Sequence, residues 1–171
     1  MVASKNKILG IDPGYGICGW GVIKIIGNHL QKEAYGIIKT KKKDSFTDRL
    51  LALQEQLVTV IKKYAPDEVA VEEIFFTKNV KTAIAVGQAR GVIILTCAQA
   101  KLKIFEYKPN EVKLAVTGYG AATKIQIKSM TKILLNLQQA PKIDDAADAL
   151  AVAICHANSK EYKRIYNDSA S

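Results

Sequence analysis

Residues 7–14, Lys-Ile-Leu-Gly-Ile-Asp-Pro-Gly, give the first clue to the architecture, because an apolar run here ends in a carboxylate and a turn. The run predicts a buried strand, and Pro13-Gly14 predicts the turn that ends it. An ionised carboxylate beside so much apolar surface is costly unless a positive charge compensates it. No Lys or Arg lies next to Asp12 within this strand, so the compensating charge must come from elsewhere.

The segments that follow predict an antiparallel meander. Residues 18–26 contain Trp20 and several β-branched side chains, and residues 29–40 follow the turn Gly27-Asn28. Residues 14–19 match the dinucleotide pattern G-x-G-x-x-G, but that pattern must open a helix. Here it runs into a strand-like segment, so we reject the dinucleotide interpretation. The D-x-G loop of actin-like and sugar kinases, which also precedes a hairpin, stays open as an alternative.

Helices and short strands alternate in the rest of the chain. Ser45 with Asp48, and Thr123 with Gln126, have the spacing of helix-capping pairs. Gly87 and Gly91 would allow another backbone to approach, either from the sheet or from a second subunit. We expect strands at 68–72 and 102–107, and helices at 46–64, 79–100, 109–116, 123–137 and 144–158. This order predicts an α/β fold with a mixed five-stranded sheet and helices on its faces. Residues 1–158 should form one domain, followed by a frayed polar tail at 159–171.

The composition is that of a globular protein with a basic surface. The chain has 171 residues, is 49% hydrophobic and carries a net charge of +9, which favours a polyanionic partner such as nucleic acid. Three widely spaced cysteines suit reduced thiols in a cytoplasm. The N-terminus lacks the apolar core of a signal peptide. The apolar stretch at 91–100 is too short to span a bilayer, so no membrane partner is expected.

Three further carboxylates have positions as unusual as that of Asp12. Glu72 ends the apolar run 69–71, while Asp145 and Asp148 lie three apart at the start of an Ala-rich helix. If that helix packs on the sheet, its two acids would reach the strand ends. Hard oxygen ligands of this kind suit Mg²⁺ or Mn²⁺, and paired ions can cleave phosphodiesters. A simpler interpretation is that Asp145 and Asp148 favour the positive helix N-terminus, a role that Asp144 fits better.

Four blocks of sequence together resemble the RuvC family of bacterial Holliday-junction resolvases. They occur in the family's order over roughly residues 7–158, and the third and fourth are the most specific. The blocks are Ile-Leu-Gly-Ile-Asp-Pro-Gly at 8–14, Val-Glu-Glu-Ile-Phe at 71–75, Gly-Gln-Ala-Arg-Gly at 87–91 and Asp-Ala-Ala-Asp-Ala-Leu-Ala at 145–151.

The resemblance implies an RNase H-like homodimer that nicks two opposed strands of a four-way DNA junction, leaves 5′-phosphate ends and takes part in DNA recombination and repair. It implies two Mg²⁺ ions per active site, with Mn²⁺ as a substitute, and RuvA–RuvB as branch-migration partners. It assigns the metal-ligand and catalytic roles to Asp12, Glu72, Asp145 and Asp148, with Asp12 bridging both ions. It also assigns base stacking to Phe75 and DNA-backbone contacts to Lys113 and Lys124.

Two residues depart from the family pattern. Gly16 and Cys18 stand where a larger residue and a Thr or Ser are more usual, which alters the first hairpin without removing an acid. Three other functions stay open: a related nuclease acting on RNA, an actin-like phosphotransferase, and a DNA-binding module without catalysis.

Overall fold

The computed structural model describes residues 7–74 and 80–169, with side chains placed as far as Lys160. One mixed sheet has the strand order β3-β2-β1-β4-β5. β1 pairs antiparallel with β2, which pairs antiparallel with β3, whereas β1, β4 and β5 run parallel. The strands are β1 Lys7–Asp12, β2 Ile17–Ile26, β3 His29–Lys39, β4 Glu68–Glu72 and β5 Lys103–Tyr107. The predicted meander and five-stranded mixed sheet are confirmed.

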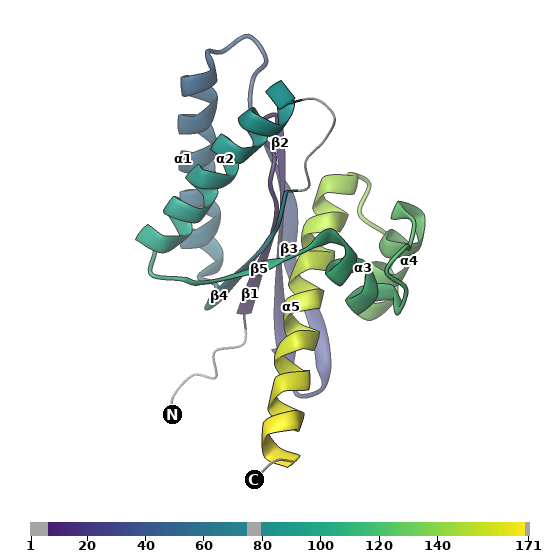
Figure 1. The fold of residues 1–171 in the computed structure, drawn as a ribbon. Helices are drawn as coiled ribbons and strands as arrows, with labels where there is room; N and C mark the ends of the chain where they lie inside the picture. The colour runs from purple at the N-terminus through teal and green to yellow at the C-terminus, as the bar shows by residue number, and fades with distance from the viewer. Residues whose placement is uncertain (1–6, 75–79, 170–171) are drawn as a thin grey trace.

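Helices cover both faces of the sheet, as predicted. α1 and α2 pack together on one face, while α5 lies along the other, with α3 and α4 against it (Figure 1). The helices are α1 Phe46–Tyr64, α2 Val80–Gln99, α3 Pro109–Thr117, α4 Lys124–Leu134 and α5 Asp144–Ser169.

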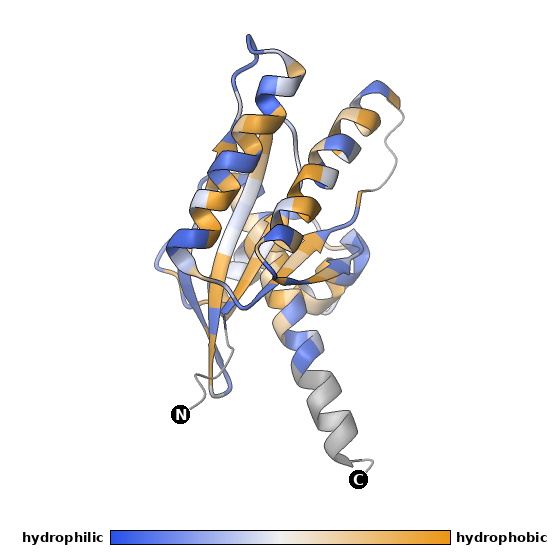
Figure 2. Ribbon diagram, turned by 90° about the vertical axis from the view of Figure 1, so that its left-hand side faces the viewer, coloured by the Kyte–Doolittle hydropathy of each residue, from blue (hydrophilic) through white to orange (hydrophobic). Residues whose placement is uncertain are grey.

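β1 is buried on both sides because its side chains alternate between two cores. Ile8 belongs to the core beneath α5, whereas Leu9 and Ile11 belong to the core beneath α1 and α2. Figure 2 shows hydrophobic colour along the strands and α5, and an alternation of hydrophilic and hydrophobic residues along α1. Two-sided burial explains why β1 reads as a continuous apolar run.

The capping residues in the sequence predicted the starts of α1 and α4 correctly, whereas the predicted ends of α4 and α5 differ from the observed ones. Ser45 Oγ accepts a hydrogen bond from the Asp48 amide at 3.1 Å, and Thr123 with Gln126 forms a reciprocal capping box. α4 ends at Leu134 rather than 137, just before Asn136 adopts a left-handed φ of 48°. The predicted helix end at 158 is wrong, since α5 continues to Ser169 through residues without Gly or Pro.

Two sequence interpretations concern the glycine-rich turn and α2. β2 follows the turn directly at Ile17, so no helix opens there and the dinucleotide site is excluded as predicted. α2 is longer than the apolar stretch considered above, and by length and mean hydropathy (1.3) it could span a bilayer. Its residues Ala89, Ile93 and Cys97 are buried in the core beneath α1 and α2.

Candidate active site

Asp12 and Glu72 meet because their strands are parallel neighbours. Ile11 of β1 pairs with Val71 of β4, so the next residue of each strand emerges at the same edge of the sheet. Asp12 follows the alternation that puts Ile8 on the α5 face, and Glu72 follows that of Ala70. The Asp12 carboxyl donates a hydrogen bond to the Glu72 carboxylate.

Two glycines bring the acids of α5 onto this edge. A Cβ at Gly10 would lie 2.8 Å from the Cβ of Ala153, and one at Gly19 would overlap the carbonyl group of Asp145. Gly19 is also the pairing partner of Asp12 across β1 and β2. The first turn of α5 therefore lies directly over the end of β1. The sequence analysis sought close backbone approach at Gly87 and Gly91 instead, but a Cβ at either would meet nothing within 4 Å.

The shifted pKa values show that the acids lie close together. Desolvation, and then the charges of Glu72, Asp148 and Asp145, raise the pKa of Asp12 from 3.8 to about 8. Desolvation, followed by the charge of Asp148, raises the pKa of Glu72. Desolvation also raises the pKa of Asp148, although Lys124 opposes the shift. Residues distant in sequence thus gather at one sheet edge, and we call this group of four acids the acidic pocket. Their role as metal ligands stays a prediction.

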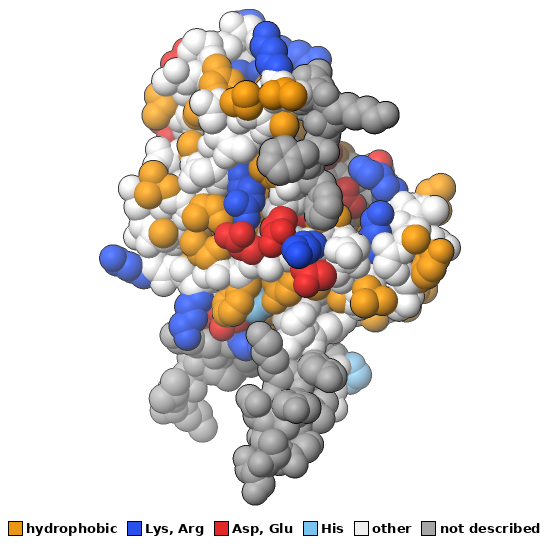
Figure 3. Space-filling view, in the orientation of Figure 1, with side chains coloured by type: hydrophobic (Ala, Val, Ile, Leu, Met, Phe, Trp, Pro, Cys, Tyr) orange, Lys and Arg blue, Asp and Glu red, His pale blue; other side chains and the backbone are white. Residues whose placement is uncertain are grey.

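Basic side chains border the pocket. Lys124 Nζ lies 3.6 Å from Asp148 Oδ2, and the charge of Lys113 lowers the pKa of Glu72. Asp144 pairs with Lys128 at 2.9 Å, and its charge also acts on Asp148 and Lys124. In the view of Figure 3, acidic, Lys and Arg side chains lie close together near the middle of the molecule. Phe75, the predicted stacking residue, lies outside the described residues.

The donor set fits a divalent cation by its chemistry. Four carboxylates offer hard oxygen ligands, and a cation would relieve the repulsion that raises three of their pKa values. Among residues 7–74 and 80–160, no group of three or more His, Cys, Asp or Glu side chains is already spaced as a metal site.

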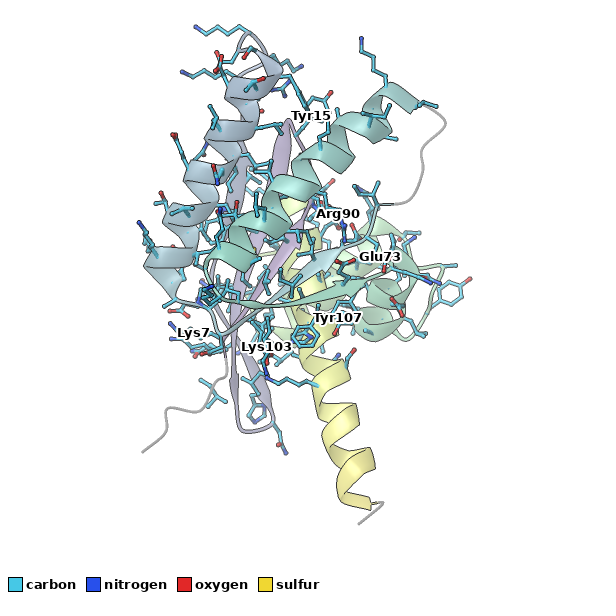
Figure 4. The ribbon with its side chains drawn as sticks, turned by 60° about the vertical axis from the view of Figure 1, so that its left-hand side comes forward. Lys7, Tyr15, Glu73, Arg90, Lys103 and Tyr107 are labelled. Atoms are coloured by element: carbon cyan, nitrogen blue, oxygen red, sulfur yellow. The ribbon has the colours of Figure 1, made fainter. Side chains whose placement is uncertain are left out.

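Arg90 supports the end of β4, and the sequence analysis gave it no role. Its Nε donates to the Glu72 carbonyl at 3.4 Å, and its guanidinium pairs with Glu106 of β5 at 2.7 Å. The Glu73 amide donates to the Tyr107 carbonyl at 2.8 Å. Figure 4 shows Arg90 beside Glu73 where β4 ends. Arg90 therefore fixes the backbone that presents Glu72. The only signal for this was its place in the Gly-Gln-Ala-Arg-Gly block.

A second polar cluster joins α5 to the other end of β4. His156, which is 2% exposed, lies 3.0 Å from Glu68 Oε2 through Nε2 and 2.7 Å from the Tyr107 hydroxyl through Nδ1. Lys160 adds a 2.7 Å contact to the same Glu68 oxygen. β4 is thus held to α5 at its start and faces the acids of α5 at its end. The sequence analysis gave His156 no role and missed this cluster.

Known proteins that are similar to this chain in sequence and fold include junction resolvases. The family model described as crossover junction endodeoxyribonuclease RuvC matches residues 8–156. The RuvC of Halothermothrix orenii is 54% identical over 157 residues, covering 92% of this chain and 95% of its own, and that of Thermotoga maritima is 47% identical, covering 95% and 96%. The structure of Thermus thermophilus RuvC with a Holliday junction has a TM-score of 0.88 at 31% identity, covering 92% of this chain and 96% of its own. The yeast mitochondrial resolvase Ydc2 shares the fold, with a TM-score of 0.68 at 13% identity. These neighbours confirm the RNase H-like fold, and the chain belongs to the RuvC family of crossover junction endodeoxyribonucleases.

Proposed function

We propose that this protein is the metal-dependent endonuclease that resolves four-way DNA junctions, cutting two opposed strands to leave 5′-phosphate nicks. Its membership of the RuvC family makes it a nuclease and implies a requirement for a divalent metal. The observation that carries the proposal is the convergence of Asp12, Glu72 and the α5 acids at one sheet edge.

Asp12, Glu72, Asp145 and Asp148 would hold the metal, which we propose to be a pair of Mg²⁺ ions with Mn²⁺ as a substitute. When bound, such ions make a water molecule acidic enough to attack phosphorus and neutralise charge on the leaving oxygen. The chain contributes four carboxylates and their placement. Asp12 must lose its proton to act as a ligand, and Arg90 holds the backbone of Glu72 in position.

Lys113 and Lys124 would guide the DNA backbone to the acids. Each borders the pocket, and Lys124 is 74% exposed, so it can pair with phosphate as readily as with Asp148. Such contacts make binding fall with salt and carry no sequence information by themselves. The preference for branched DNA would therefore come from the shape of the junction. Phe75 is proposed to stack on a base there, from its sequence position alone.

Two symmetric cuts require two active sites, and α2 offers a surface for a second copy of the chain. Val80 and Leu95 are 69% and 55% exposed, and Gly87 and Gly91 are exposed between them on the same helical face. A Cβ at either glycine would meet nothing within 4 Å, so a helix of a partner subunit could approach closely. We propose a homodimer through this face. Cytoplasmic location and cooperation with RuvA–RuvB remain predictions from the family resemblance.

The proposed activity can be tested on three substrates. Purified protein would be incubated with a synthetic four-way junction, the matched linear duplex and an RNA hairpin, each with Mg²⁺ or with EDTA. We expect paired symmetric nicks in the junction alone, abolished by EDTA and by Asp12→Asn. Asp144→Asn is the matched control, because Asp144 pairs with Lys128 and is not one of the four proposed ligands, and it should cut normally.

Three results would contradict the proposal. Equal cutting of the linear duplex would exclude junction selectivity, and preferential cutting of the hairpin would indicate an RNA nuclease. Junction binding without cutting would indicate a DNA-binding module that lacks catalysis. An actin-like phosphotransferase would instead hydrolyse ATP, which the same protein preparation should not do.

A further inference from the structure

A cleft of about 410 Å³ lies between the β1–β2 turn and the first turns of α1 and α2. Its volume is within the range of about 300–1,000 Å³ that is usual for ligand pockets. Tyr15 and Phe46 form an aromatic wall, and α2 contributes Lys81, Ile84 and Gln88. The cleft thus combines aromatic surface, a cation and an amide group, and none of these residues belongs to the acidic pocket.

The aromatic wall is held in place by its neighbours. The rings of Tyr15 and Phe46 have centroids 6.0 Å apart and are tilted by 59°. The Arg49 guanidinium lies 4.6 Å from the centre of the Tyr15 ring, and it also donates a hydrogen bond to the Tyr15 carbonyl. Thr40 Oγ1 donates to the same carbonyl at 2.6 Å. This side of the cleft is therefore ordered before any ligand enters.

The position of the cleft indicates what occupies it. Tyr15 is three residues beyond Asp12, on the turn that leaves the acidic pocket, and Figure 4 shows it between the upper parts of α1 and α2. The exposed lysines 41–43 occupy the loop that leads to α1. Tyr15 packs against the core beneath α1 and α2, whereas Asp12 lies on the α5 side of β1. A DNA strand bound at the acids would therefore reach this aromatic surface and positive charge by passing the end of β1. Aromatic side chains with neighbouring cations are how proteins hold unpaired bases.

We propose that this cleft is an accessory subsite for one unpaired base of the junction strand, which stacks on the aromatic wall while Lys81 contacts its phosphate. A base paired within a duplex could not enter the cleft, so the subsite would favour DNA that is open near the cut. The inference rests on the proposed junction-cutting function and adds a binding site for the nucleotides that flank the acids.

The test uses junctions with the fluorescent base 2-aminopurine placed, one position at a time, on either side of the cut. The Asp12→Asn protein with Mg²⁺ prevents cutting during the titration. We expect strong quenching at one position near the cut, because an aromatic ring stacks on that base. Phe46→Ala should remove the quenching and weaken binding about fivefold or more. Leu51→Ala, at a 51% exposed position of the same helix, is its control.

A charge reversal supplies a second test at an exposed position. Lys81→Glu should also weaken junction binding. It should lower the number of phosphates neutralised on binding, read from the slope of log affinity against log salt, by at least about one. Lys62→Glu makes the same change in the last turn of α1, and it should have little effect.

The outcomes separate the subsite from the overall function. If the junction is cut normally but no position is quenched, or if both variants behave like their controls, the subsite is wrong and the nuclease proposal stands. If Phe46→Ala and Lys81→Glu shift the sedimentation of the free protein from dimer to monomer, the cleft holds a second copy and the base subsite is also wrong. If the protein neither binds nor cuts the junction, both proposals fail.

Discussion

Removing the charge of Asp12 should stabilise the metal-free protein at neutral pH while abolishing cleavage. The unfolded Asp12 carboxyl titrates near its ordinary pKa of 3.8, whereas in the folded protein its pKa is about 8. Between these values the folded state holds more protons than the unfolded state, so stability must fall as pH rises. Below pH 4 and above pH 8 this contribution should be constant.

The size of the effect follows from the shift in pKa. About four pKa units at about 1.4 kcal/mol each set an upper limit near 6 kcal/mol. Asp12 is only partly buried and its carboxyl donates a hydrogen bond to Glu72, so solvent and the neighbouring acid make the loss of stability smaller than this limit. We expect about 2–3 kcal/mol of lost stability between pH 5 and pH 8, and Asp12→Asn should recover most of it.

The assay is urea denaturation of the protein in EDTA at several pH values, followed by circular dichroism. The original protein should lose stability as pH rises, and Asp12→Asn should give a flatter profile. Asp144→Asn, whose carboxylate is paired with Lys128, should follow the original profile. Saturating Mg²⁺ should remove the loss, because a bound cation favours the ionised acids. Parallel profiles for the original protein and Asp12→Asn would show that the acids do not interact as described.

Four other substitutions test separate parts of the account. Lys124→Gln should change the free energy of unfolding by less than about 1 kcal/mol. It should also lower the number of phosphates neutralised on junction binding by about one, as read from the slope of log affinity against log salt in fluorescence anisotropy. Gly10→Ala should destabilise the fold by about 3 kcal/mol or more in urea denaturation, since its Cβ would collide with α5. Gly87→Ala should leave folding intact yet weaken the dimer in analytical ultracentrifugation, and an unchanged dimer would contradict the α2 interface. Arg90→Leu should lower kcat about 10- to 100-fold, because it frees the backbone that presents Glu72.

Much of the fold was predictable because local and long-range signals agreed. The apolar run of β1, the meander and the capping residues Ser45 and Thr123 each indicated the element that the structure contains. The end of α5 was not predictable by the same means. Loss of apolar residues after Asn158 indicated a tail, yet a polar segment without Gly or Pro can continue a helix beyond the core.

The candidate site was predictable as a set of acids but not as an arrangement. Four carboxylates at strand ends and a helix start indicated a metal site, and the structure brings them together. The acids of α5 reach the sheet edge because Gly10 and Gly19 have no side chain. In the sequence, both residues look like ordinary strand glycines. Arg90 acts on the backbone of Glu72 across two elements, a contact that requires the tertiary fold to be known.

The central claim is that acids from β1, β4 and α5 form one divalent-metal site. Anomalous diffraction from crystals soaked in Mn²⁺ tests it directly. The account predicts manganese density bounded by Asp12, Glu72, Asp145 and Asp148, and none there in crystals of Asp12→Asn. Manganese bound elsewhere, in crystals of a protein that cuts junctions with Mn²⁺ in solution, would contradict it.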